Sequence, residues 1–217
     1  MQRMTAAAAS AHDPLALQPD SVSIVEVSPR DGLQNESVVV PLDGKERLVR
    51  ALLDAGLTRV EITSFVSPKW VPQLADAAEL VERLGAAEGR WLSALVPNQK
   101  GLERALSVGL REIAVFLSAS ETHNKMNINK TIDTTLEVFR EIVPPALEAG
   151  VRVRAYVSTV WGCPYEGEVA LERVMHVARR LADLGCYQIS FGDTIGVGTP
   201  NKVRDVVNAL RSELPLD

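Results

Sequence analysis

Short apolar, β-branched runs alternate with longer segments of helical periodicity from residue 21 to the end of the chain. This alternation is typical of βα units and a parallel sheet. Six strands are predicted, at residues 23–27, 59–63, 91–96, 112–118, 152–158 and 187–191. Their centres are almost continuously apolar, as expected for strands that are covered on both faces.

Glycine marks the end of four predicted helices. Gly56, Gly109, Gly150 and Gly185 each stand two or three residues before the start of a predicted strand. Glycine adopts the left-handed conformation that ends a helix without a steric penalty, so one kind of helix-to-strand connection is predicted to occur four times. The predicted strands start at intervals close to the roughly 30 residues of a crossover unit with its helix.

Two segments that contain proline carry local predictions. Pro144 and Pro145 lie inside the helical pattern of residues 132–147, where proline removes a backbone donor, so a break or a kink is expected. Residues 196–200 read Gly-Val-Gly-Thr-Pro. This segment is either a phosphate-binding loop or, as we favour, a loop in which Thr199 caps a helix that begins at Pro200.

Polar side chains gather at the carboxyl ends of the predicted strands. Arg30 and Asp31 follow the first strand, Glu61 lies in the second and Asp193 follows the sixth. Parallel strands bring their carboxyl ends to one edge, where substrates bind in both barrels and open sheets. We therefore expect these four residues to converge on one pocket.

The pattern leaves two architectures open. Six strands suit an open, doubly wound sheet, whereas an eight-stranded (β/α)8 barrel needs two more. A dinucleotide-binding sheet should carry Gly-x-Gly-x-x-Gly after its first strand, but residues 28–33 read Ser-Pro-Arg-Asp-Gly-Leu. A nucleotide-binding sheet is therefore the less favoured alternative, and longer motifs are needed to choose the barrel.

Composition narrows the class of protein. The 217 residues are 46% hydrophobic and 24% charged, which is ordinary for a soluble globular protein. A net charge of -5 without a run of like charges argues against nucleic acid or membrane as a partner, and no segment approaches the ~18 apolar residues of a membrane span. Residues 1–20 are predicted to be a disordered tail, and residues 21–217 one catalytic domain. With only Cys163 and Cys186, both interpreted as structural, a disulfide framework is not expected and a cytoplasmic location is.

Three blocks of sequence carry a family resemblance. Residues 25–36 read VEVSPRDGLQNE, residues 61–73 read EITSFVSPKWVPQ, and residues 162–167 and 185–200 read GCPYEG and GCYQISFGDTIGVGTP. The first block resembles the opening motif of metal-dependent carbon–carbon lyases and Claisen-type synthases, and its long form is similar to the 3-hydroxy-3-methylglutaryl-CoA (HMG-CoA) lyases. The resemblance implies an α/β fold, a TIM (β/α)8-type parallel barrel of pyruvate carboxyltransferase-like type, with about six βα units in this chain.

The resemblance also implies a reaction and roles for five residues. HMG-CoA would be cleaved to acetyl-CoA and acetoacetate in leucine degradation and ketone-body formation, with a divalent cation, Mg or Mn, as cofactor. Asp31 would be a metal ligand and help take the hydroxyl proton, since hard cations prefer oxygen ligands. Arg30 would bind the substrate and stabilise charge on its thioester oxygen. Glu61 and Asp193 would orient this site, and Tyr156 would lie near the substrate.

Structural roles remain open for two of these carboxylates. As less favoured alternatives, Glu61 would be a paired carboxylate of the strand end, and Asp193 the cap of the turn that follows it. Two other readings of the whole chain also remain: a related Claisen-type synthase or keto-acid aldolase, and a non-catalytic remnant.

Several functional residues of the family pattern are missing from this chain. The family's metal site also uses a His-x-His pair and an asparagine, and its proton donor is a cysteine near the eighth strand; none of these is found here. His12, His123 and His176 are interpreted as solvated or structural. We expect a C-terminally truncated chain that is inactive alone, has an acyl-CoA as its substrate partner, and pairs its open edges in a homodimer.

Overall fold

The computed structural model describes residues 21–85 and 89–214, so the tail predicted at 1–20 lies outside the described residues. Its centre is a five-stranded parallel sheet in the order β1-β2-β3-β4-β5. Neighbouring strands are consecutive in the sequence, which is the order of a parallel barrel. The strands are β1 (Arg59–Ser64), β2 (Trp91–Leu95), β3 (Glu112–Ser118), β4 (Arg152–Ser158) and β5 (Gln188–Phe191).

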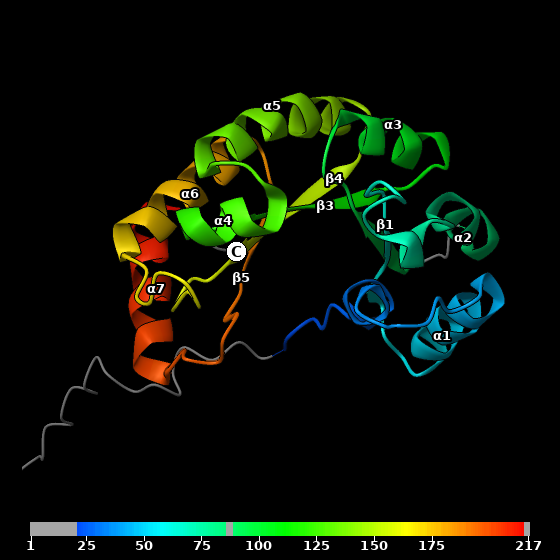
Figure 1. Ribbon diagram of the computed structural model, residues 1–217, viewed down its shortest axis with the longest axis horizontal. Coiled ribbons are helices and arrows are strands. Elements are labelled where there is room, and N and C mark those ends of the chain that lie inside the picture. Colours follow the sequence, from blue (N-terminus) through cyan, green and yellow to red (C-terminus); the bar gives the residue numbers. More distant parts are fainter. Residues whose placement is uncertain (1–20, 86–88, 215–217) are drawn as a thin grey trace, which may run out of the picture.

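Helices alternate with the strands and form an arc around one face of the sheet, with α1 and α7 at its two ends (Figure 1). The short α4 lies outside this alternation, because it precedes α5 in the same connection. The elements are η1 (Ser28–Gly32), α1 (Leu42–Asp54), η2 (Pro72–Leu74), α2 (Ala77–Leu84), α3 (Gln99–Ser107), α4 (Glu121–Ile128), α5 (Ile132–Glu148), α6 (Leu171–Asp183) and α7 (Pro200–Glu213).

Alternate side chains of each strand face the helices and the concave side of the sheet. In β4, Val153, Ala155 and Val157 are fully buried in the hydrophobic core. Arg152 and Tyr156 occupy the alternate positions of the same strand, where Arg152 bonds Glu112 and Tyr156 bonds Glu61. The apolar positions thus pack against the helices, and the polar positions form hydrogen bonds on the concave side.

The predicted helix ends are confirmed. Gly56, Gly109, Gly150 and Gly185 have φ values of 99°, 73°, 74° and 93°, a region that side chains with a Cβ rarely adopt. Thr199 caps α7, since its side chain accepts a hydrogen bond from the backbone N–H of Lys202 and Pro200 is the first helical residue.

The prediction of a strand at residues 23–27 is wrong, because only an isolated bridge joins Glu26 to Val60. The N–H of Glu26 donates to the carbonyl of Arg59 at 3.0 Å, and the N–H of Glu61 donates to the carbonyl of Glu26 at 2.7 Å. The segment pairs with one neighbour only, and the Glu26 side chain already accepts the N–H of Ser28, where η1 begins. The chain therefore turns into η1 after a single bridge to β1 and does not continue as a strand.

Of the break or kink predicted at Pro144 and Pro145, the break is wrong, since α5 continues through both residues to Glu148, and the kink stays a prediction. Each proline removes one helical hydrogen bond. The buried side chains of Ile142, Val143 and Ala146 hold the last turns of the helix against the sheet. Tertiary packing therefore overrides the local penalty.

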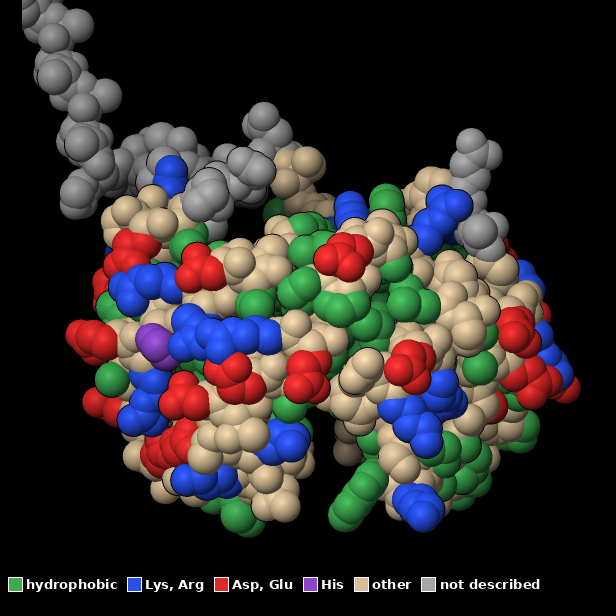
Figure 2. Space-filling view, turned by 90° about the horizontal axis from the view of Figure 1, so that it is seen from above, with side chains coloured by type: hydrophobic (Ala, Val, Ile, Leu, Met, Phe, Trp, Pro, Cys, Tyr) green, Lys and Arg blue, Asp and Glu red, His purple; other side chains and the backbone are tan. Residues whose placement is uncertain are grey.

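Acidic and basic side chains are interspersed over the outer face that carries α3 and α5 (Figure 2). This distribution agrees with a sequence that has no run of like charges. Among the described residues, no helix combines the length and the apolar character that crossing a membrane requires.

Candidate active site

Arg30 and Asp31 lie in η1, directly after the bridge at Glu26. Their backbone N–H groups both donate to the carbonyl of Val27, at 3.0 and 2.7 Å. Pro29 is buried beneath the turn. This tight turn presents two charged side chains in succession at the carboxyl edge of β1.

Arg30 is fixed between two carboxylates. Its Nε lies 2.5 Å from Oε1 of Glu61, and its Nη1 lies 2.6 Å from Oδ1 of Asp31. The side chains of Arg30 and Glu61 are 12% and 1% exposed, whereas that of Asp31 is 55% exposed. The buried glutamate therefore holds the arginine, and the aspartate faces solvent.

Tyr156 is the second hydrogen-bond donor to Glu61. Its hydroxyl donates to Oε2 of Glu61 at 2.8 Å, so both glutamate oxygens accept hydrogen bonds. Burial raises the pKa of Tyr156, and the adjacent Glu61 charge raises it further, so the phenol stays protonated as a donor. Burial alone would lower the pKa of Arg30, but Glu61 and Asp31 outweigh it and the pKa is raised. Arg30 is thus a permanently charged, immobile donor.

Arg154 extends this site, although the sequence analysis gave it no role. Its guanidinium carbon lies 4.8 Å from the centre of the Tyr156 ring, on the same face of β4. The side chain is buried, and within the described residues its Nε and Nη1 have no hydrogen-bond partner. The period-two spacing of Arg152, Arg154 and Tyr156 is the signal that would have placed it on the concave side.

Asp193 is not joined to Arg30 by any hydrogen bond or ion pair among the described residues. Its two carboxylate oxygens accept the N–H groups of Val197 and Gly198, at 3.0 and 2.7 Å. This is the turn-capping arrangement that the sequence left open. Among the predicted site residues, the structure therefore brings together Arg30, Asp31, Glu61 and Tyr156, and gives Asp193 to the loop that follows β5.

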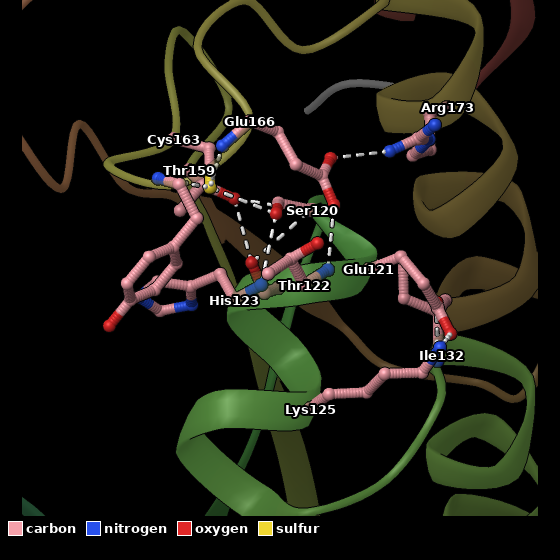
Figure 3. A network of polar contacts seen from close by, with 12 residues as sticks. Ser120, Glu121, Thr122, His123, Lys125, Ile132, Thr159, Cys163, Glu166 and Arg173 are labelled. Atoms are coloured by element: carbon pink, nitrogen blue, oxygen red, sulfur yellow. Dashed lines mark hydrogen bonds and ion pairs between the residues drawn. The ribbon is translucent and has the colours of Figure 1, made fainter.

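A second polar cluster lies at the ends of β3 and β4 (Figure 3). The Ser120 hydroxyl lies 2.9 Å from Sγ of Cys163 and accepts the N–H of His123, which caps α4. The Thr159 hydroxyl lies 2.7 Å from that of Ser118. The sequence pattern did not predict α4 or the contacts of these hydroxyl groups.

Glu166 ties the loop before α6 to the start of α4 (Figure 3). Its carboxylate accepts the N–H of Thr122 at 2.6 Å and pairs with Arg173 at 2.9 Å. Burial would raise the pKa of Glu166, but the hydrogen bonds from Thr122 and the charge of Arg173 lower it overall. The carboxylate thus acts as an ionised cap supplied from a distant loop.

The histidines and cysteines of the described residues lie outside the cluster of Arg30, Asp31, Glu61 and Tyr156. His123 is half-buried beside Tyr165, and burial lowers its pKa; His176 is exposed on α6, and His12 lies outside the described residues. Both cysteines are free, as predicted. Burial raises the pKa of Cys186 to about 12, so this thiol stays protonated.

The described residues fit a divalent cation only in part. Within residues 21–85 and 89–214, no three His, Cys, Asp or Glu side chains come together as a metal site. Asp31 offers an exposed carboxylate, one oxygen of which is shared with Arg30. One ligand of this kind falls short of the six to eight oxygens around a calcium ion or the near-octahedral set that magnesium demands.

Comparison with known proteins gives one consistent family. The model of the HMGL-like family matches residues 21–217. The mitochondrial hydroxymethylglutaryl-CoA lyase of Bos taurus is 50% identical over 198 residues, which cover 91% of this chain and 61% of the relative. The cytoplasmic 3-hydroxy-3-methylglutaryl-CoA lyase of Rattus norvegicus is 46% identical, over 91% of this chain and 57% of the relative.

Solved structures agree with the curated relatives. Hydroxymethylglutaryl-CoA lyase from Pseudomonas aeruginosa superposes with a TM-score of 0.87 at 49% identity, over 91% of this chain and 66% of that one. An HMG-CoA lyase from Acinetobacter baumannii, solved with coenzyme A and 3-methylmalate, gives a TM-score of 0.83 at 36% identity, over 88% and 62%. The predicted partial barrel and the predicted resemblance are confirmed. The chain spans about three-fifths of the length of these curated relatives. Because the family model matches it from residue 21 to residue 217, the chain belongs to the HMGL-like family.

Proposed function

We propose that this chain carries the arginine half of an HMG-CoA lyase active site, which cleaves the substrate to acetyl-CoA and acetoacetate. The observation that carries the proposal is the immobile Arg30, held by a buried glutamate at the sheet edge where barrels bind substrates, with Asp31 exposed beside it. Such a cleavage belongs to leucine degradation and ketone-body formation.

Arg30 stabilises the charge that develops during cleavage. As the bond between C2 and C3 of the substrate breaks, its electron pair moves onto the thioester as an enolate. A guanidinium that is already fixed and charged donates to the enolate oxygen without reorganising. Glu61 and Tyr156 keep it in place, because both oxygens of Glu61 are occupied.

Asp31 accepts the proton that the C3 hydroxyl loses, since its carboxylate is exposed at the same edge. The enolate then takes up a proton to give acetyl-CoA. The chain's two thiols lie elsewhere: Cys163 is buried against Ser120, and Cys186 precedes β5 at the opposite edge of the sheet. We assign no described residue to that second proton transfer.

Asp31 would also supply one oxygen ligand to Mg or Mn, a cation that polarises substrate oxygens. Because the other described residues do not complete the ligand set, the affinity that they confer on the cation is weak. We further propose an acyl-CoA as the substrate partner, a cytoplasmic location, and a homodimer formed through the edges of the sheet.

Substrate binding tests this function directly. We would titrate the chain with HMG-CoA, and separately with a 4-hydroxy-2-keto acid, in the presence of the diamagnetic Mg²⁺, and follow binding by saturation-transfer NMR and product release by mass spectrometry. We expect HMG-CoA to bind, Arg30→Lys to weaken binding at least tenfold, and Arg140→Lys, on the outer face of α5, to leave it unchanged. Preference for the keto acid would favour an aldolase, and binding of neither ligand would overturn the proposal.

A further inference from the structure

Thr159 adopts a backbone conformation that its residue type disfavours. Its φ is 60°, and the residue is fully buried at the end of β4. The other non-glycine residue with positive φ among those described is Asn129, which ends α4 and belongs to a type that tolerates the left-handed region. In a β-branched residue this conformation is a strain that persists only where the surroundings enforce it, and such strain clusters at functional sites.

The Thr159 hydroxyl is the group through which neighbouring residues restrain this conformation. It donates to the carbonyl of Ser158 at 2.7 Å, lies 2.7 Å from the hydroxyl of Ser118, and accepts the N–H of Ser120 at 3.1 Å. These contacts join Thr159 at the end of β4 to the end of β3 and to the residue that caps α4, Ser120; Figure 3 shows Thr159 and Ser120 side by side. Three hydrogen bonds therefore hold one side chain, and they fix its backbone.

The Thr159 backbone N–H reaches in the other direction. It donates to Oγ1 of Thr194 at 2.8 Å, in the loop after β5. Thr194 is adjacent to Asp193, whose carboxylate closes the same loop through Val197 and Gly198. The φ angle sets the direction of the N–H relative to the side chain of the same residue, so with the Thr159 hydroxyl held in place this bond depends on the conformation at 159.

We propose that Thr159 is a positioning residue: its hydroxyl enforces the left-handed conformation, which aims its N–H at Thr194 and thereby fixes the Asp193 loop against the ends of β3 and β4. The residue acts through the loop and does not touch the reacting atoms. Its meaning for catalysis rests on the proposed function, but the geometry of the loop does not.

The proposal separates two substitutions that both delete the hydroxyl. Thr159→Val keeps the β-branch but loses the bonds that enforce the strain, so the N–H turns away and the loop opens. Thr159→Gly adopts the left-handed conformation freely and keeps the bond to Thr194. Amide hydrogen exchange at Val197 and Gly198, read by NMR, should accelerate about tenfold in Thr159→Val and stay near wild type in Thr159→Gly and Thr159→Ser.

Two further variants keep the test decisive. Thr135→Val removes a buried hydroxyl that accepts a hydrogen bond from Asn124 of α4 and donates one to the carbonyl of Thr131 at the start of α5, and it should leave exchange at Gly198 unchanged. Thr194→Val removes only the acceptor of the Thr159 N–H and should accelerate exchange at Val197 and Gly198 as Thr159→Val does. This variant supplies the test if Thr159→Val fails to fold. Equal exchange in the valine and glycine variants at 159, or no change in Thr194→Val, would overturn the proposal. None of these readouts needs turnover, so loss of the proposed lyase activity would not be confused with them.

Discussion

Two glutamates of the concave face, Glu112 at the start of β3 and Glu61 inside β1, are equally buried but are held differently. At the amino edge Glu112 is 1% exposed and pairs with Arg59 at 3.3 Å and with Arg152 at 2.6 Å. The Arg152 guanidinium lies between two rings, 3.7 Å from the centre of Trp91 and 4.3 Å from that of Tyr187. Each charged group at this edge thus has partners within the fold.

Glu61, inside β1, is also 1% exposed, but it holds one tyrosine and one arginine, Arg30, which comes from the turn at the carboxyl edge. Arg30 also forms an ion pair with Asp31, whose side chain is 55% exposed. The same residue types therefore form two different networks: Glu112 binds two arginines, whereas Glu61 binds one arginine whose second partner is an exposed carboxylate. In barrels the carboxyl edge carries the chemistry and the amino edge the stability, and the difference here lies in whether the network ends in an exposed carboxylate.

The largest effect on stability is expected from Glu112→Gln, which leaves two arginines without their carboxylate. We expect a loss of about 3 kcal/mol in the free energy of unfolding. Glu61→Gln should cost about half as much, because Arg30 keeps Asp31 and solvent. Urea denaturation of both variants measures the difference, and equal losses would contradict the distinction between the edges.

Removing one hydroxyl at each edge should give a smaller difference of the same kind. Tyr156→Phe deletes a hydrogen bond to a buried, charged carboxylate, which costs about 1.5 kcal/mol. Tyr187 is 41% exposed, so Tyr187→Phe should cost about 0.5 kcal/mol or less. Thermal unfolding of the pair tests this, and a larger loss in Tyr187→Phe would reverse the assignment.

Alkaline pH should distinguish the same two tyrosines. Burial raises the pKa of both above the ordinary value of 10.0, and it does so more strongly for Tyr156. The unfolded phenol ionises above pH 10 while the folded one does not, so stability is complete below pH 10 and falls as the pH rises further. Tyr156 should contribute about 1 kcal/mol of loss by pH 11. Chemical unfolding at pH 9 and pH 11 should show a shallower loss in Tyr156→Phe than in the wild type, and identical slopes would contradict this.

The smallest effect on stability is expected at the open end of the network. Asp31→Asn changes an exposed side chain, so unfolding should shift by about 0.5 kcal/mol or less. The same substitution should abolish weak Mn²⁺ binding, measured by water proton relaxation, because it removes the proposed ligand. Asp43→Asn, on an exposed aspartate of α1, is the control and should retain binding. Retained binding in Asp31→Asn would remove this residue from the metal proposal.

Much of the fold could be predicted because its determinants are local. The strands at 112–118 and 152–158 have the predicted bounds, and the glycine helix ends and the Thr199 cap are confirmed. The candidate site was predicted through motifs, and four of its residues lie in contact. The first strand and the break in α5 were mispredicted, because each depends on neighbours that local sequence does not contain.

By itself, the sequence determined the alternation of strands and helices, the helix ends, and the family, since these follow from backbone sterics, capping and contiguous motifs. Only the tertiary structure decided which charges meet: Arg30 binds a glutamate 31 positions away, and Tyr156 reaches the same glutamate from 95 positions away. It also decided that Asp193 serves its own loop and that Thr159 is strained. Such pairings depend on the register and curvature of the sheet, which bring together side chains whose separation in the chain carries no local signal.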